Sequence, residues 1–150
     1  MTLLGLLDLS AALDCVDYDI LLRRLNIPFG IDGMVLQWIK SFPDVQTRRF
    51  SYNGHLSSVA SVRCGVPQDS VLGPLFILLY TSELFDVIAE CSLVGHSYAN
   101  NILTYFCVPA ADEASAAKQF ALYVRRIEMW MGSNHLKLNA DKTRVIQIGS

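Results

Sequence analysis

Two short apolar runs separated by a polar stretch constrain the fold of this chain most. Residues 91–95 and 102–106 flank residues 96–101, which hold small side chains and two asparagines. Because Asn tolerates the positive φ of tight hairpin turns, the pattern predicts a β-hairpin with buried arms and a polar tip. The adjacent side chains of Asn100 and Asn101 would point to different sides of that tip. An Asp pair there would suit a hard cation, whereas an Asn pair brings no charge.

The N-terminal segment predicts a strand beside this hairpin. Residues 2–9 form an apolar run with Asp8 near its end. Such a run is typical of a central strand, and it places a carboxylate at the strand's carboxyl end.

Two helices and a hairpin are predicted between residues 17 and 62. Asp17 caps a first helix that stops at residues 28–30, and Asp32 caps a second helix that ends at Pro43. Asn53-Gly54 predicts a type I′ hairpin turn. The second helix is expected to turn three apolar side chains inward: Val35, Trp38 and Ile39.

The C-terminal half continues with two helices and a pair of strands. Residues 71–89 predict a helix with Pro74 in its first turn. Residues 112–132 predict another, capped by an Asp and ended by a Gly, and residues 136–138 and 143–148 predict two strands. The inward positions of the helix over 112–132 follow the helical period: Ala117, Phe120, Ala121, Val124, Ile127 and Met131.

The order of these elements predicts the fold class. With the first two helices and the middle hairpin set aside as an insertion, the order is strand, helix, two strands, helix, strand. This is the split βαββαβ arrangement of α+β proteins, an antiparallel sheet with helices on one face. The open face would carry Asp8 beside the hairpin tip.

Composition limits the classes of partner. The 150 residues suffice for one domain. Hydrophobic residues make up 52% and charged residues 17%, so either the interior is large or apolar surface is left uncovered, which would suggest a missing protein partner or missing flanking domains. The net charge of −2 argues against an autonomous nucleic-acid binder. The basic pairs are interpreted as solvated faces: Arg23-Arg24, Arg48-Arg49 and Arg125-Arg126.

Cysteine spacing and hydropathy indicate the compartment. The four cysteines form no C-x-x-C pair and no zinc spacing with the histidines, which favours structural thiols in a reducing compartment. Residues 3–7 lack the basic region of a signal sequence, and the run at 71–80 is too short to span a bilayer. We therefore expect an intracellular protein of the cytoplasm or nucleus that is neither secreted nor membrane-bound.

A strand-end carboxylate facing a hairpin tip can hold metal ions. Phosphoryl-transfer enzymes use such carboxylates to bind two magnesium ions, which clamp the attacking and leaving oxygens of an in-line displacement. An isolated strand-end Asp is also commonly a cap or a surface residue. The spacing alone leaves both interpretations of Asp8 open.

Four segments together resemble a known family. Residues 7–14 (LDLSAALD), 65–74 (GVPQDSVLGP), 98–101 (YANN) and 136–143 (LKLNADKT) resemble, in order and spacing, the successive motifs of reverse transcriptases from non-long-terminal-repeat (non-LTR) retrotransposons, of the LINE type and Jockey-like. The resemblance implies that residues 1–150 are the palm of such a domain with the inserted helices and hairpin, that most of the fingers and the thumb are absent, and that this is a degenerate copy.

The resemblance implies metal-binding roles at the predicted strand end and hairpin tip. Asp8 matches the first metal-binding aspartate, and Leu9 follows it with a backbone carbonyl that can face a metal. Asn100 and Asn101 match the aspartate pair of the family's Tyr-Ala-Asp-Asp box. Tyr98 is expected to pack under the hairpin.

The resemblance also implies roles in nucleotide binding and in release of the leaving group. Leu13 stands where the family usually has the Phe that excludes a ribose 2′-hydroxyl. Gln68 matches the glutamine that contacts the incoming nucleotide. Asp69 replaces a Gly that lets the backbone approach that nucleotide; alternatively, it caps the following helix. Lys142 matches a basic residue that stabilises the departing pyrophosphate, and a solvated turn lysine is its simpler interpretation.

The implied function is RNA-directed DNA polymerisation, by template-directed nucleotidyl transfer with two Mg²⁺ ions. The implied partners are an RNA template and a DNA primer. Because Asn replaces both residues of the Asp pair, we expect weak or absent Mg²⁺ binding and a catalytically inactive copy. The alternatives are a non-catalytic interaction module built on the palm and a remnant without function.

Overall fold

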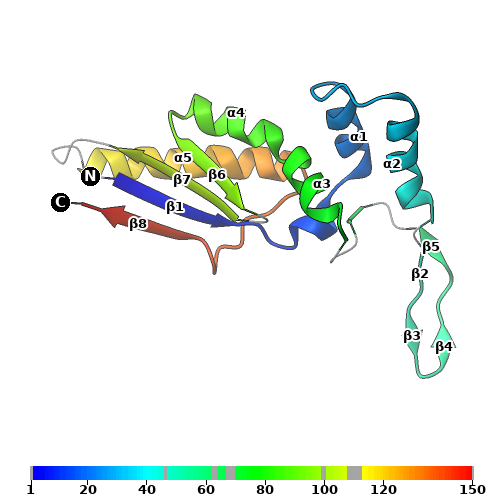
Figure 1. The fold of residues 1–150 in the computed structure, drawn as a ribbon. Helices are drawn as coiled ribbons and strands as arrows, with labels where there is room; N and C mark the ends of the chain where they lie inside the picture. The colour runs from blue at the N-terminus through cyan, green and yellow to red at the C-terminus, as the bar shows by residue number, and fades with distance from the viewer. Residues whose placement is uncertain are drawn as a thin grey trace.

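A four-stranded antiparallel sheet organises the chain (Figure 1). Its strands are β1 (Thr2–Asp8), β6 (Val94–Tyr98), β7 (Asn101–Cys107) and β8 (Arg144–Ile148), in the spatial order β6-β7-β1-β8. The computed structural model describes residues 2–45, 47–61, 64–66, 70–98, 101–107 and 113–149. The central position of β1 explains its apolar run, and the split βαββαβ prediction is confirmed.

Two helices cover one face of this sheet: α4 (Ser82–Glu90) and α5 (Glu113–Ser133) (Figure 1). They approach it over small residues, because Gly5, Thr104 and Gly95 form one row across β1, β7 and β6. A Cβ on Gly5 would lie 2.6 Å from the ring of Phe120 in α5, and a Cβ on Gly95 would lie 3.0 Å from Ile88 in α4. The other face of the sheet has no helix over it in the part of the chain described.

The insertion follows β1 and a short 3-10 helix, η1 (Ala12–Cys15). It comprises α1 (Tyr18–Asn26), α2 (Gly33–Val45) and a long hairpin made of β2 (Thr47–Arg48), β3 (Ser51–Tyr52), β4 (His55–Leu56) and β5 (Ala60–Ser61). The side chain of Asp17 accepts a hydrogen bond from the backbone N–H of Ile20, as predicted for a cap. Asn53 and Gly54 both have positive φ, 48° and 78°, as a type I′ turn requires.

The prediction for α2 was wrong in two respects. Ile39 is buried, but Val35 and Trp38 are exposed. The helix also continues past Pro43 to Val45. Because α2 packs beside α1 at the edge of the molecule, only a narrow stripe of its surface finds a neighbour (Figure 1).

The helix predicted over residues 71–89 is two helices, α3 (Gly73–Tyr80) and α4, which meet at Thr81. Pro74 lies in the first turn of α3, as predicted. At the break, the guanidinium of Arg24 donates to the carbonyl of Tyr80. The hydroxyl of Thr81 donates to the carbonyl of Ile77 at 2.8 Å. These side-chain donors occupy carbonyls near the junction between the two helices.

Arg24 also corrects the prediction for the basic pairs. It is buried rather than part of a solvated face. The two strands predicted near the C-terminus reduce to one, because Leu138 forms only an isolated bridge with Leu9.

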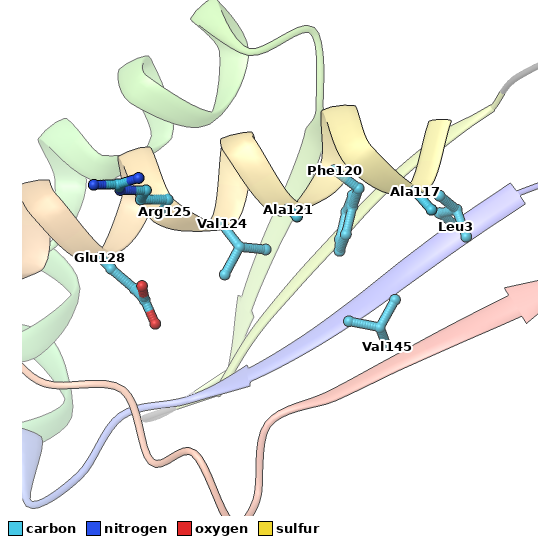
Figure 2. Close-up of a pocket in the computed structure, with 8 residues that line it drawn as sticks. All are labelled: Leu3, Ala117, Phe120, Ala121, Val124, Arg125, Glu128 and Val145. Atoms are coloured by element: carbon cyan, nitrogen blue, oxygen red, sulfur yellow. The ribbon is translucent and has the colours of Figure 1, made fainter. Parts of the chain in front are cut away.

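The stripe predicted on α5 is buried only in part. Phe120, Ile127 and Met131 are buried, but Ala117 and Ala121 are exposed. A cavity of about 450 Å³ lies between α5 and the strands β1 and β8, and both alanines line it together with Phe120 and Val145. Figure 2 shows these side chains on α5 and β8. The short Ala side chains do not reach β8. The predicted cap, Asp112, lies outside the described residues.

The hairpin formed by β6 and β7 has a shorter tip than the predicted residues 96–101. β6 extends to Tyr98 and β7 begins at Asn101. The two arms of this hairpin differ in burial: the strand β7 holds the buried Ile102 and Thr104, whereas Val94 of β6 is exposed. The difference arises because β6 is an edge strand of the sheet. None of the helices in the described ranges is both long and apolar enough to cross a membrane.

Candidate functional site

The strand register brings Asp8 and Asn101 together. Asp8 is the register partner of Asn101, which is in turn the partner of Tyr98, so the three residues form a row across β1, β7 and β6. Leu7 is buried on the helix-covered side, and side chains alternate along a strand. The row therefore lies on the open face of the sheet, as predicted.

A cavity of about 410 Å³ surrounds this row. Asp8, Asn101 and Lys142 all line it, so the structure brings three of the predicted site residues into one place. The Asp8 side chain is buried at the cavity wall, whereas Asn101 and Lys142 are exposed. Asn100, the other member of the predicted pair, lies outside the described residues.

Backbone hydrogen bonds place Lys142 beside β1. The N–H of Asn139 donates to the carbonyl of Asp8 at 2.8 Å, and the N–H of Ser10 donates to the carbonyl of Lys137 at 2.8 Å. The carbonyl of Asn139 then accepts from Lys142 and Thr143 in a tight turn. Two segments far apart in the chain are thereby joined at the end of β1, next to the buried Leu9.

The second of the four motif-like segments, residues 65–74, begins next to Leu13. The N–H of Val66 donates to the carbonyl of Leu13 at 2.7 Å. Gly65 has a φ of 94°, and a Cβ there would lie 3.1 Å from the carbonyl oxygen of Asp14, so the close approach favours glycine. The hydroxyl of Tyr18 donates to the Gly65 carbonyl at 2.6 Å, and burial raises the pKa of Tyr18, which keeps this donor protonated. Gln68 and Asp69 lie outside the described residues.

Comparisons with known proteins point to one family of domains, although no protein-family model matches the chain. The RNA-directed DNA polymerase from mobile element jockey of Drosophila melanogaster is 27% identical over 142 residues, which cover 91% of this chain and 15% of that protein. The probable RNA-directed DNA polymerase from transposon X-element of the same species is 28% identical over 124 residues, 80% of this chain and 13% of that protein.

Solved structures share the fold. Apo telomerase from Candida tropicalis, truncated from its C-terminal domain, matches 99% of this chain and 31% of its own with a TM-score of 0.69 at 15% identity. Telomerase from Candida albicans, in complex with a fragment of telomeric RNA, matches 97% of this chain and 28% of its own with a TM-score of 0.68 at 13% identity. The chain is similar in sequence to RNA-directed DNA polymerases of mobile elements, and it shares the fold of the telomerase structures. It spans about 15% of the length of the jockey protein.

The donor groups that the structure describes at this cavity do not suit a pair of divalent cations. Among the residues described, no group of three or more His, Cys, Asp or Glu side chains could hold a metal. Asp8 is the one carboxylate in the described wall of the cavity, and Lys142 adds a positive charge. The amide oxygen of Asn101 and the carbonyl of Leu9 are neutral donors, whereas Mg²⁺ sites rely on carboxylates.

Two residues on the cavity wall of the domain received no site role from the sequence. Tyr98, expected to pack under the hairpin, is exposed on the open face beside Asn101. His96 lines the same cavity and stacks on the ring of Tyr105, with centroids 6.0 Å apart. Period-two spacing from Asn101 across a two-residue turn would have placed both side chains on this face.

Proposed function

We propose that this domain derives from an RNA-directed DNA polymerase and no longer catalyses nucleotidyl transfer. The observation that carries the proposal is the pairing of Asp8 with Asn101 across adjacent strands, at a cavity that Lys142 also lines. The proposal treats residues 1–150 as a palm fragment of a longer polymerase.

The proposed loss of activity follows from the reduced negative charge of the site. Template-directed nucleotidyl transfer needs two cations that stabilise the attacking and leaving oxygens, and these cations need carboxylate ligands. Loss of one preorganised electrostatic partner commonly costs about 10²–10³ in rate. Replacement of both members of the pair, Asn100 and Asn101, should cost more. In the ancestral reaction Lys142, which lines the same cavity, would stabilise the departing oxyanion.

The nucleotide side of the proposal rests on three residues. Gln68 would contact the incoming nucleotide, and Leu13 would stand beside its sugar as a less effective wall than an aromatic ring. A carboxylate at Asp69 would add negative charge near the triphosphate and oppose its binding. The partners of the ancestral activity are an RNA template and a DNA primer, bound weakly here, and the proposed location is intracellular.

Cation binding by a revertant tests the site. We expect the variant Asn100→Asp/Asn101→Asp to bind Mn²⁺ at least about tenfold more tightly than the parent, because affinity rises with ligand charge. Titration calorimetry measures the affinity, and Mn²⁺ paramagnetic resonance measures the bound fraction. The parent is expected to extend no primer with Mg²⁺ or Mn²⁺.

Two controls make this test specific. Asn53→Asp adds a carboxylate at the tip of the inserted hairpin, where Asp also tolerates positive φ, and should not raise Mn²⁺ affinity. Adding Asp8→Asn to the revertant should remove the gain. A gain that survives this third substitution would refute the site assignment, as would template-dependent incorporation by the pure parent.

A second candidate function is a non-catalytic protein-interaction module. Exposed apolar side chains on the open face favour it: Leu6, Ile146 and Ile148. A gel-shift experiment distinguishes this interaction module from a polymerase-derived domain. A polymerase-derived domain should bind a primer–template junction more tightly than either strand alone, with a steep salt dependence. An interaction module should show no preference for the junction.

A further inference from the structure

The insertion begins and ends at two cysteines. Cys15 is the last residue of η1, before α1 begins, and Cys64 follows β5, before the segment that leads to α3. Between them lie α1, α2 and the long hairpin, which stand to one side of the sheet (Figure 1). We call the two segments that meet here, residues 13–17 and 64–66, the neck of the insertion. All four cysteines of the chain are free thiols.

Backbone pairing holds the two segments of the neck together. Cys64 forms an antiparallel bridge with Asp17, and the N–H of Gly65 donates to the carbonyl of Val16 at 2.9 Å. Val16 and Asp17 have extended backbone conformations. Side chains two positions apart on an extended backbone point to the same side, so the side chain of Cys15 lies on the side of the neck that carries Cys64.

The other flank of Cys15 also touches this segment. A Cβ on Gly65 would lie 3.2 Å from the Cα of Asp14. Cys15 therefore lies between two residues, Asp14 and Asp17, whose backbones each contact residues 64–65. A disulfide requires such an approach, because its two Cα atoms must lie within about 7 Å of each other.

The two thiols differ in exposure. Cys64 is exposed, whereas Cys15 is partly buried. Burial raises the pKa of the Cys15 thiol, and negative charge at Cys64 and at Asp14 raises it further. The effect of one thiol on the other agrees with their placement as neighbours in the neck. An oxidant in water therefore meets Cys64 first, while Cys15 stays protonated beside it.

The other two cysteines provide internal references. Cys107 is exposed like Cys64, but it pairs with Thr2 at the start of β1, whereas Cys15 follows the end of that strand. The strand has seven residues and is about 20 Å long, which is too far for a disulfide to span. Cys91 is buried after the end of α4, away from oxidants in solvent.

We propose that Cys15 and Cys64 form a redox site, at which hydrogen peroxide converts the two thiols into a disulfide that closes the neck of the insertion. The Cys64 sulfur attacks the peroxide, so that an S–O bond forms, the O–O bond breaks and hydroxide takes the thiol proton away as water. The Cys15 sulfur then attacks this sulfenic acid, an S–S bond forms and a second water leaves. Two thiols are oxidised and one peroxide is reduced, and glutathione reverses the change by thiol–disulfide exchange. The inference does not depend on the proposed function.

Oxidation of the full chain, followed by peptide mass spectrometry, tests this proposal. The reduced protein is treated with an equimolar amount of hydrogen peroxide, and the remaining thiols are alkylated. We expect Cys15–Cys64 as the main linked product, with Cys91 and Cys107 still alkylated. The matched control is Cys107→Ser, which removes another exposed thiol and should form the same bond. Cys64→Ser, also at an exposed site, should leave Cys15 free for alkylation.

The stability of the oxidised chain provides a second measurement. Because the bond closes a loop that contains the whole insertion, the oxidised chain should unfold at a urea concentration about 1–2 M higher than the reduced chain. Dithiothreitol should reverse this shift. Cys107→Ser should show the full shift, and Cys64→Ser should show none.

Four outcomes would overturn the proposal. The first is that the folded chain forms bonds to Cys107 as readily as the Cys15–Cys64 bond. The second is that peroxide converts Cys64 to the sulfinic acid while Cys15 stays free, and the third is that the bond forms only in urea. The fourth is that the bond lowers the urea midpoint, because a disulfide that distorts the native neck stores strain.

Discussion

Arg24 is the side chain that joins the insertion to the rest of the molecule. It is 1% exposed. From α1 it donates to the carbonyl of Tyr80, to Glu83 at 2.7 Å and to the side-chain oxygen of Asn134 at 2.7 Å. Its guanidinium also lies 5.1 Å from the ring centre of Trp130 in α5. A buried charge is tolerated here because both terminal nitrogens of the guanidinium donate to acceptors.

Arg24→Met is therefore expected to lower the free energy of unfolding by about 2–3 kcal/mol, because it leaves the carbonyl of Tyr80 and the side-chain oxygen of Asn134, both in buried residues, without this donor. Urea denaturation measures the change. The matched control is Arg126→Met, because the Arg126–Glu90 pair is exposed, with side chains 53% and 59% accessible. That variant should lose less than about 1 kcal/mol. Equal losses in the two variants would contradict the assigned role of Arg24.

At the scale of elements, the contact of α5 with β1 depends on the absence of a side chain at Gly5. A Cβ there would lie 2.6 Å from the Phe120 ring and 3.0 Å from the hydroxyl of Thr104. Both neighbours are buried, so neither can move away without disturbing the core.

We expect Gly5→Ala to destabilise the chain by about 1–3 kcal/mol through overpacking. Adding Phe120→Leu should recover part of the loss, because it removes the clashing atoms. Gly132→Ala is the control: apart from the nearby backbone of α5 and its two chain neighbours, nothing lies within 4 Å of its Cβ position, and Ala favours a helix by about 1 kcal/mol. Thermal unfolding compares the parent with Gly5→Ala, Gly5→Ala/Phe120→Leu and Gly132→Ala. A neutral Gly5→Ala would mean that α5 does not pack this closely on β1.

At the scale of the whole molecule, two buried tyrosine hydroxyls link segments that are distant in the chain. Tyr18 donates to the carbonyl of Gly65, and Tyr80 donates to the carbonyl of Asn134 at 2.8 Å. Burial raises the pKa of both hydroxyls above their usual value of 10.0. In the unfolded chain they ionise near that value, so the folded state holds more protons at alkaline pH. Their contribution to stability is complete below about pH 10 and is lost as the pH rises through the raised pKa values.

The variant Tyr80→Phe tests this linkage. At neutral pH it should be less stable than the parent by about 1–2 kcal/mol, because it lacks the hydrogen bond. That difference should shrink above about pH 10, where the parent loses its advantage. Urea denaturation across the pH range measures the difference. Tyr98→Phe, at an exposed site on the open face, should track the parent at every pH. A Tyr80→Phe difference that grows with pH would have the wrong sign.

Much of the fold was predictable because neighbouring residues encode it. The cap at Asp17, the turn at Asn53-Gly54 and the apolar run of β1 depend on local backbone conformation and hydrogen bonding, and the structure has all three. In the candidate site, the neighbours that follow from the strand register were predictable. Asp8 beside Asn101 follows from pairing β1 with β7, and period-two spacing along β6 puts Tyr98 and His96 on the same face. No local pattern brings Lys142 to the wall of the same cavity.

By itself, the sequence determined the order and type of the main elements, and hence an antiparallel sheet with Asp8 at its open face. The tertiary structure alone decided which apolar faces find a neighbour. It left Val35, Trp38 and Ala121 exposed, divided one predicted helix at Thr81, and placed Lys142 beside the end of β1. The physical reason is distance along the chain: caps and turns form between residues a few positions apart, whereas burial depends on elements that meet only when the whole chain has folded.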